Sequence, residues 1–196
     1  MVAAGVPDWY IGSCKKIKYL FPKAHAVAYC MMAFRIAWFK VYHPLAFYAA
    51  YFYRRSQKGG FDAVLMTGGM EAVKANIAAI EADEEATAKD DGLLTTLEVV
   101  YEFYLRGFEF LPIDVYKSHA KKFLIEDGKI RPPFVAISGL GESAAEDLME
   151  GRVGKSFLSI EEVAAACPKV SKTHMQMLKD AGAFGDLPET SQVSLF

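Results

Sequence analysis

The fold is decided by the stretch Ile137-Ser138-Gly139-Leu140-Gly141, which is followed at helical spacing by Ala144, Ala145, Leu148 and Met149. This order of apolar, small, glycine, apolar and glycine positions before an amphipathic helix is typical of a helix-hairpin-helix. The glycines permit a tight turn and a close backbone approach. The N–H groups that begin the next helix then face outward, where they can bind a phosphate without reading a base. Alone, the pattern also fits an ordinary pair of helices with structural glycines.

A second, degenerate hairpin is expected further along the chain. Ser171-Lys172-Thr173 begins another short helix, which ends at Ala181-Gly182. We predict DNA contacts at both turns, from Ser138, Gly139, Leu140, Gly141, Lys172 and Thr173. No internal repeat is apparent in the sequence.

Around these turns the chain is predicted to be mainly α with a small β element, an α+β fold. We expect helices at 8–21, 23–42, 45–53, 62–82 (interrupted at Gly68-Gly69) and 93–105, strands at 108–113 and 123–130 with a turn through Asp127-Gly128, and helices again over 134–184. The stretch 82–91 is expected to be an exposed connection, and 187–196 an untethered tail. The apolar run Ala26 to Phe39 contains Arg35 and is too short for a membrane span, so it predicts a buried helix.

Charge is distributed unevenly along the 196 residues, although the net charge is only -2. Residues 1–60 hold nine basic residues and one acidic residue, residues 61–112 hold three and eleven, and residues 113–196 hold ten and twelve. The basic opening segment favours a polyanionic partner, either nucleic acid or a nucleoside triphosphate. A solvated basic face without a partner is the alternative.

The opening segment also interleaves lysines with aromatic residues from Ser13 to Tyr29. Such a pattern suits a site that neutralises phosphates and packs a flat base. His25 and Tyr29 are four residues apart, and Lys15 and Lys18 three apart, so each pair shares a helix face. Taken singly, His25 also fits a capping or core histidine, and Tyr29 a core tyrosine.

Nothing in the sequence indicates a catalytic or metal centre. The three cysteines, Cys14, Cys30 and Cys167, form no CxxC pair, so we expect reduced, buried thiols. The sequence shows no two-metal carboxylate set, no nucleophile with a nearby base and no Walker-type loop. The N-terminus lacks the features of a signal peptide, so we expect a cytoplasmic, nucleoid-associated protein with no membrane partner.

Several stretches together resemble PolC-type bacterial DNA polymerase III in order and spacing, from about residue 6 to residue 196. They are Pro7 to Ile11, Ser13 to Tyr19, Phe21 to Ala26, Arg35 to Lys40, His43-Pro44-Leu45, Ala86 to Lys89, Leu93-Leu94-Thr95, Pro132-Pro133-Phe134, Gly139 to Glu142 and Ser194-Leu195-Phe196. The last of these resembles the ending that the family uses to bind the sliding clamp. Two positions depart from the family pattern: Ser138 replaces a proline in the hairpin, and Val193 replaces a leucine in the tail.

The resemblance implies three functional parts of a C-terminal polymerase segment. Residues 1–58 would be the end of the fingers domain, 59–186 a duplex-binding region with its helix-hairpin-helix at about 134–152, and 187–196 a flexible clamp-binding tail. The incoming dNTP would be contacted by Lys15, Lys18, Phe21, Lys23, His25 and Tyr29, the primer–template duplex by the two turns, and the clamp by Gln192, Val193, Ser194, Leu195 and Phe196. The five-residue tail also fits a chance match.

The palm aspartates that hold metal ions in such polymerases have no counterpart in this sequence. We therefore expect no catalytic residue and no cofactor in this chain, whereas the parent polymerase would use Mg²⁺ through its palm. Two interpretations stay open: a non-catalytic segment of a replicative DNA-directed DNA polymerase, or a free-standing DNA- and clamp-binding protein derived from one. A DnaE-type polymerase is a third, which the tail and the segment Lys15 to Tyr19 disfavour.

Overall fold

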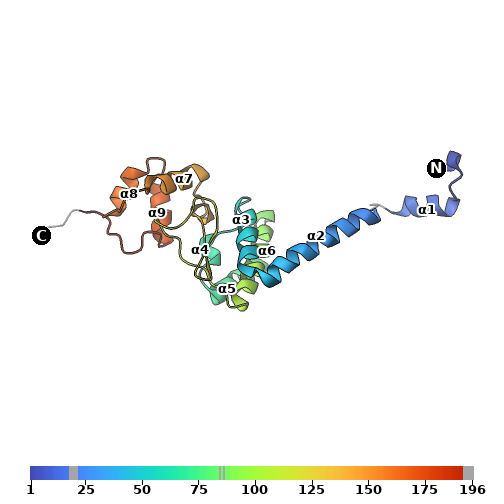
Figure 1. Ribbon diagram of the computed structural model, residues 1–196, viewed down its shortest axis with the longest axis horizontal. Coiled ribbons are helices and arrows are strands. Elements are labelled where there is room, and N and C mark those ends of the chain that lie inside the picture. The colour runs from blue at the N-terminus through green and yellow to red at the C-terminus, as the bar shows by residue number, and fades with distance from the viewer. Residues whose placement is uncertain (18–21, 84, 86, 192–196) are drawn as a thin grey trace. The chain divides into compact units, whose positions relative to one another are not determined.

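The computed structural model describes residues 1–17, 22–83, 85 and 87–191 (Figure 1). Packing divides the chain into one unit from Met1 to Tyr42 and another from His43 to Phe196. This division differs from the predicted functional boundaries at residues 58 and 186. Those boundaries concern function rather than packing, and they stay predictions.

The first unit consists of a short 3₁₀ helix, η1 (Val2–Ala4), and two α-helices, α1 (Asp8–Lys16) and α2 (Lys23–Tyr42). The observed α2 agrees with its predicted range. The observed α1 ends earlier than predicted, because Ile17 has an extended backbone. The last four residues of the predicted helix, 18–21, lie outside the described part of the chain.

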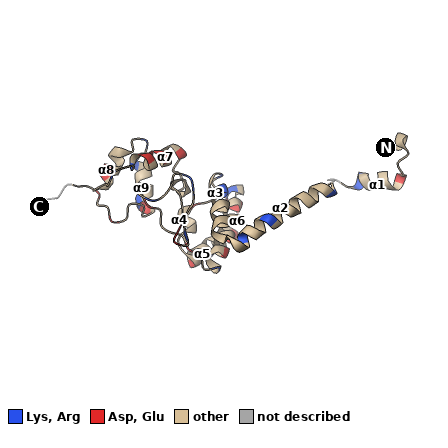
Figure 2. Cartoon of the chain, viewed as in Figure 1, with Lys and Arg blue, Asp and Glu red and all other residues tan. Residues whose placement is uncertain are grey.

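The helix α2 is apolar on every side, yet the described residues do not bury it. Phe34 is 78% exposed and Trp38 is 49% exposed, and no residue of the helix is buried. Figure 2 shows its few basic residues spread along the helix rather than gathered on one face. The expectation of a buried helix is therefore not met within the first unit, and Cys30 is exposed with it. A helix that is apolar all round is typical of burial inside a larger protein.

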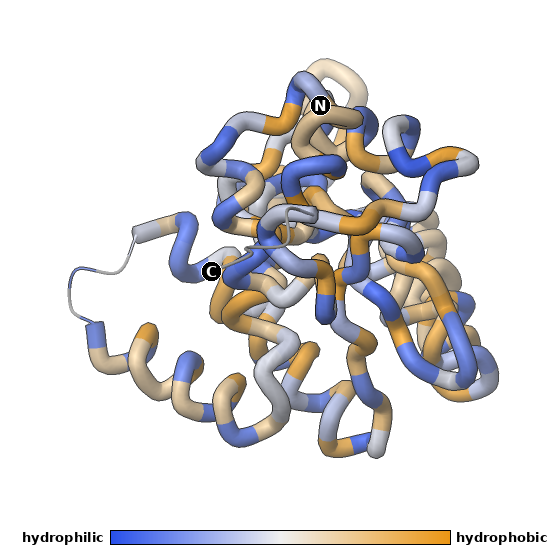
Figure 3. The backbone as a smooth tube through the Cα atoms, turned by 90° about the vertical axis from the view of Figure 1, so that its left-hand side faces the viewer, coloured by the Kyte–Doolittle hydropathy of each residue, from blue (hydrophilic) through white to orange (hydrophobic). Residues whose placement is uncertain are grey.

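The second unit begins with helices that surround an aromatic core. They are α3 (Pro44–Ser56), α4 (Ala63–Met66), α5 (Met70–Glu81) and α6 (Ala88–Leu105). Hydrophobic and hydrophilic residues are interspersed along the chain, as Figure 3 shows. Such mixing is expected of helices that pack only one face inward. The ring of Phe103 lies 4.6 Å from that of Phe110 and 5.1 Å from that of Tyr48, centroid to centroid. These aromatic contacts join α6 to α3 and to the chain that follows α6.

The helix α6 begins at Ala88, earlier than the predicted residue 93, because Thr87 and Asp90 form a capping box at its amino end. The Thr87 N–H donates to Asp90 Oδ2 at 2.9 Å. Hydrogen bonds from Thr87 lower the pKa of Asp90. Residues 88–91 are therefore helical, and the predicted exposed connection is shorter than expected. Gly107 ends the helix as predicted, with a φ of 78°.

The β element is one short hairpin. Strands β1 (Leu124–Glu126) and β2 (Lys129–Arg131) pair antiparallel across the predicted Asp127-Gly128 turn, whose two φ angles, 50° and 77°, are both positive. The strand predicted at 108–113 is wrong. Phe110 makes only an isolated bridge to Ile130, and Pro112 has no N–H with which to continue a ladder. The mainly α fold with a small β element is confirmed.

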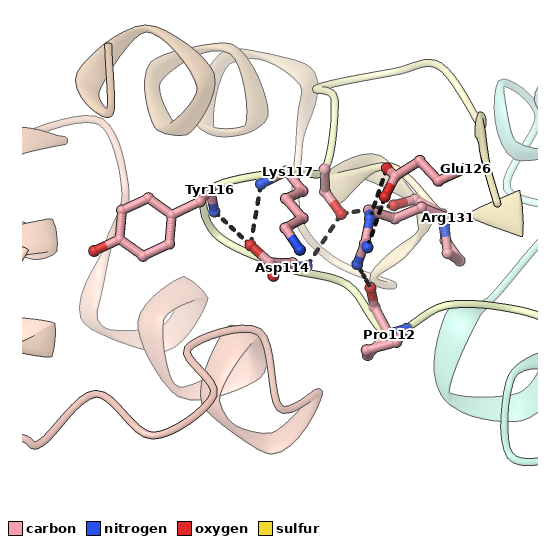
Figure 4. Close-up of polar contacts among 8 residues, drawn as sticks. Pro112, Asp114, Tyr116, Lys117, Glu126 and Arg131 are labelled. Carbon is pink, nitrogen blue, oxygen red and sulfur yellow. Dashed lines mark hydrogen bonds and ion pairs between the residues drawn. The ribbon is translucent and has the colours of Figure 1, made fainter. Parts of the chain in front are cut away.

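A buried arginine joins this hairpin to the loop before it. The Arg131 side chain donates to both carboxylate oxygens of Glu126 at 2.8 Å and to the Pro112 carbonyl at 2.6 Å (Figure 4). The bond from Arg131 holds the pKa of Glu126 below its usual range. In the same loop, Asp114 Oδ1 accepts the N–H groups of Tyr116 and Lys117 at 2.8 and 3.0 Å. The loop that leads toward the helix-hairpin-helix is thus fixed by polar contacts.

Candidate nucleic-acid interface

The first hairpin runs from the 3₁₀ helix η2 (Phe134–Ala136) through a turn into α7 (Glu142–Gly151). The Leu140 N–H donates to the Ile137 carbonyl at 3.1 Å and closes the turn around Ser138 and Gly139. Gly139 has a φ of 91°, a backbone conformation that residues other than glycine rarely adopt. Ile137 and Leu140 are buried, whereas Ser138 and Gly139 are exposed. The turn is therefore held from the core and faces outward, as the sequence pattern predicts.

The second hairpin runs from α8 (Ile160–Ala166) into α9 (Lys172–Asp180) and shares the hydrogen-bond and burial pattern of the first, although Lys169 does not have the positive φ of Gly139. The Val170 N–H donates to the Cys167 carbonyl at 3.0 Å and closes a turn around Pro168 and Lys169. Cys167 and Val170 are buried, and the residues between them are exposed. The structure thus shows a second hairpin and, with it, an internal repeat that is not apparent in the sequence.

The two hairpins pack against each other, and α7, α8 and α9 lie together in Figure 1. A Cβ atom on Gly139 would lie 3.0 Å from Cε of Met177 in α9. The Lys169 N–H, in the second turn, donates to Asp147 Oδ2 of α7 at 2.8 Å. Each turn is therefore in contact with the helix of the other hairpin.

The amino ends of the two hairpin helices differ in what they offer to a phosphate. In the described part of the chain, no side chain caps α7, which follows Gly141. The helix α9 is capped by Ser171, whose Oγ accepts the His174 N–H at 3.2 Å. The first hairpin therefore offers uncapped N–H groups. The second offers side chains, since Lys169, Lys172 and Thr173 are all exposed.

The acidic residues at the start of α7 are paired with a lysine from outside the hairpin. Lys121 Nζ lies 2.8 Å from Glu142 Oε2 and 2.8 Å from Glu146 Oε1. These bonds raise the pKa of Lys121 and lower that of Glu146. The Lys121 N–H donates to His119 Nδ1 at 3.0 Å, and burial lowers the pKa of His119, which favours the neutral ring that can accept this bond.

The residues predicted to contact a nucleotide lie in the first unit. Lys15 is exposed near the end of α1, and Lys23, His25 and Tyr29 are exposed along α2. The ring centroids of His25 and Tyr29 are 4.5 Å apart, so the structure brings together the pair that helical spacing predicts. Lys18 and Phe21 lie outside the described residues. The nucleotide role of this set stays a prediction.

The chain after α9 differs from the predicted untethered tail. The Ile160 N–H donates to the Pro188 carbonyl at 2.9 Å, and the Glu161 N–H donates to the Glu189 carbonyl at 3.1 Å. Lys179 also pairs with Glu189. The expectation is wrong for residues 187–189, because the first N–H groups of α8 lack intrahelical partners and take these carbonyls instead. Residues 192–196, predicted to bind the clamp, lie outside the described part.

Within the described ranges, no group of three or more histidine, cysteine, aspartate or glutamate side chains could hold a metal ion. No helix among these same residues is long and apolar enough to cross a bilayer.

Comparison with known proteins assigns the hairpins and the family. The helix-hairpin-helix motif family matches residues 107–193. "DNA polymerase III PolC-type" of Thermotoga maritima is 51% identical over 191 residues, which is 97% of this chain. The proteins of the same name from Caldanaerobacter subterraneus and Listeria innocua are 51% identical over 98% of the chain and 48% identical over 100% of it. Nearly the whole chain is therefore homologous to one segment of PolC-type DNA polymerase III proteins.

The chain spans only 14% of the length of the Thermotoga and Caldanaerobacter PolC-type proteins and 13% of the Listeria one. The resemblance inferred from the sequence, to a C-terminal segment of PolC-type polymerases, is confirmed. The helix-hairpin-helix interpretation of residues 137–149 is confirmed with it.

Sequence reasoning missed two lysines near this hairpin pair: Lys169 in the second turn, and Lys121, which contacts α7. Lys169 occupies the position in the second turn that Gly139 occupies in the first, so superposing the two turns on each other would have found it. Lys121 is brought to α7 only by the tertiary fold, and no local pattern marks it.

Gly139→Ala is expected to destabilise the fold by about 1–2 kcal/mol, because the new Cβ would have a positive φ and would meet Met177 at 3.0 Å. Thermal or urea unfolding of Gly139→Ala and of the unaltered chain measures the change in stability. Adding Met177→Ala should not restore stability, since the backbone strain remains. Full recovery in the double variant would show that crowding, and not the φ angle, governs this position.

Proposed function

We propose that this chain binds duplex DNA without reading its sequence, as a non-catalytic C-terminal segment of a replicative DNA-directed DNA polymerase. The observation that carries the proposal is the pair of hairpin turns with one hydrogen-bond and burial pattern, each facing outward at the start of a helix. Backbone N–H groups and lysines at such positions contact phosphates and carry no base information.

The same features imply that binding by this segment alone is weak. The described hairpins offer few cations, and the carboxylates of α7 lie beside the first turn. Sequence-independent binding with few phosphate contacts falls in the range of about 10⁻⁴ to 10⁻⁶ M and weakens with salt. Such a segment would contribute to duplex affinity mainly as part of a larger enzyme.

The remaining roles follow from the family and belong to the same proposal. Residues 1–58 would be the end of the fingers, and the exposed pair His25 and Tyr29, with Lys15 and Lys23, would face the incoming dNTP. The tail from Gln192 to Phe196 would attach the enzyme to the sliding clamp. Chemistry would require Mg²⁺ held by palm residues that this sequence does not contain.

The alternative, a free-standing DNA- and clamp-binding protein, would use the same hairpins. The exposed apolar surface of α2 favours the polymerase segment, because such a surface is normally covered by protein. We therefore adopt the polymerase segment as the proposal.

The test is the binding of the 196-residue chain to a fluorescein-labelled duplex, followed by anisotropy over a series of salt concentrations. We expect Lys169→Ala and Lys172→Ala each to weaken binding, and to reduce the slope of log K against log salt by about 0.9 per lost phosphate contact. Lys129→Ala is the matched control, because Lys129 lies on the β hairpin, outside both helix hairpins, and pairs with Glu109 at 2.5 Å. Unchanged slopes for the two hairpin variants would contradict the proposed contacts.

A further inference from the structure

Lys121 lies outside both hairpins, yet it contacts two residues of α7. We propose that Lys121 is a positioning residue for duplex binding: it neutralises Glu142 and Glu146, so that a phosphate can approach the uncapped N–H groups of α7. The inference rests on the proposed function and deepens it, because it names the residue that makes the first turn usable by a polyanion.

The amino end of α7 carries two carboxylates. Glu142 is the first helical residue, directly after Gly141, and Glu146 follows one turn later on the same face. Carboxylates at a helix amino end interact favourably with the same N–H groups that would hold a phosphate. Without a counter-cation, these two side chains would repel DNA from the first hairpin. The second hairpin has Lys172 at the position of Glu142 and has no such conflict.

Lys121 contacts both of these carboxylates. Its Nζ is 2.8 Å from an oxygen of each glutamate, and its side chain is 33% exposed, against 65% and 47% for Glu142 and Glu146. One ammonium thus bridges both carboxylates and lies within ion-pair distance of each. This geometry is more specific than that of an exposed lysine with one mobile partner.

Backbone hydrogen bonds fix the chain beside Lys121 relative to the first hairpin. The Phe134 N–H donates to the His119 carbonyl at 3.0 Å, and the Val135 N–H donates to the Ala120 carbonyl at 3.1 Å. The residues before Lys121 are therefore bonded to η2, the element that leads into the turn. The bond from the Lys121 N–H to His119 Nδ1 holds the chain at Lys121 itself. The backbone next to Lys121 is consequently held against the element that leads into the first hairpin.

The proposed role of Lys121 differs from that of a lysine that binds phosphate directly. A lysine that binds DNA directly contributes the same affinity whether or not Glu142 and Glu146 are charged. A lysine that acts by neutralising them matters only while they are charged. The two cases differ in additivity, which a double-mutant cycle measures.

The experiment measures duplex affinity for the unaltered chain, Lys121→Met, Glu142→Gln/Glu146→Gln and the triple variant. We expect Lys121→Met alone to weaken binding about tenfold, and less than about twofold in the background that lacks both carboxylates. Lys122→Met is the control for loss of a neighbouring positive charge, and thermal unfolding checks that each variant is folded. The expected change for this control is small.

Two outcomes would overturn the inference while leaving the proposed function intact. One is duplex binding by Lys121→Met that equals that of the unaltered chain. The other is an equal loss in both backgrounds, which would make Lys121 a direct phosphate ligand. Absence of duplex binding by the unaltered chain would instead overturn the proposed function, and the inference with it.

Discussion

Gly141→Asp is expected to weaken duplex binding by about thirtyfold while leaving α7 at least as stable as before. Gly141 has a φ of -72° and a ψ of 161°, and a Cβ atom at this position meets nothing within 4 Å. An aspartate fits this N-cap conformation, and its carboxylate would accept the N–H groups of the first helical turn. Those are the groups proposed to bind phosphate, so the variant carries its own anion in place of the DNA.

The effect on stability separates this prediction from simple misfolding. Aspartate at an N-cap stabilises a helix by a few tenths of a kcal/mol relative to glycine, so the unfolding midpoint should stay the same or rise slightly. Binding is measured by anisotropy with the labelled duplex. Gly141→Asn is the matched control, because it caps the helix with a side chain of the same size but no charge, and it should have a smaller effect. Equal affinity of the aspartate variant and the unaltered chain would show that the α7 amino end does not bind the duplex.

The elements that the sequence predicts best are those with local signals. The range of α2 is set by Pro22 and Pro44, and the β turn by Asp127-Gly128, whose positive φ angles need such residues. The start of α6 was missed although its signal is local, since Thr87 and Asp90 form a capping box. The strand predicted at 108–113 failed because strand pairing depends on a partner distant in sequence, and Pro112 cannot donate to it.

The candidate site was most clearly predictable where glycine carries the geometry, and the second hairpin was expected only in degenerate form from Ser171-Lys172-Thr173. Gly139 and Gly141 mark the first turn, because a positive φ and an uncapped helix start leave a trace in the sequence. The second turn has Lys169 and Ser171 at those positions, and its shape depends on one backbone hydrogen bond and two buried apolar residues. Such a turn has no distinctive sequence, so the sequence predicts the helix that follows it but not the turn at Pro168 and Lys169.

Burial within a larger protein is a further property that the sequence of one segment does not specify. The apolar run in α2 predicts that the helix is covered, and this holds for most apolar helices. It does not say which residues cover it. Phe34 and Trp38 are exposed in the described part of this chain, and the proposed role as a polymerase segment places the covering surface in the rest of that enzyme.

Arg131→Met is expected to lower the free energy of unfolding by about 3 kcal/mol, because it removes one partner of a buried ion pair. The arginine is 4% exposed and bonds to Glu126 and to the Pro112 carbonyl. Methionine fills a similar volume but leaves the carboxylate and the carbonyl without their donors. Urea unfolding, with a two-state fit of the free energy, measures the difference.

Two further variants separate the charge from the geometry of the Arg131 contacts. Arg131→Lys keeps the charge but loses the planar fork that contacts both oxygens of Glu126, so it should recover only part of the loss. Glu126→Gln should cost less than Arg131→Met at neutral pH. Since Arg131 holds the pKa of Glu126 below its usual value, the stabilising contribution of Glu126 is present above pH 4.5 and is lost as the pH falls through the lowered pKa. The difference between Glu126→Gln and the unaltered chain should therefore shrink on acidification. A constant difference across this range would mean that Glu126 acts through its shape and not through its charge.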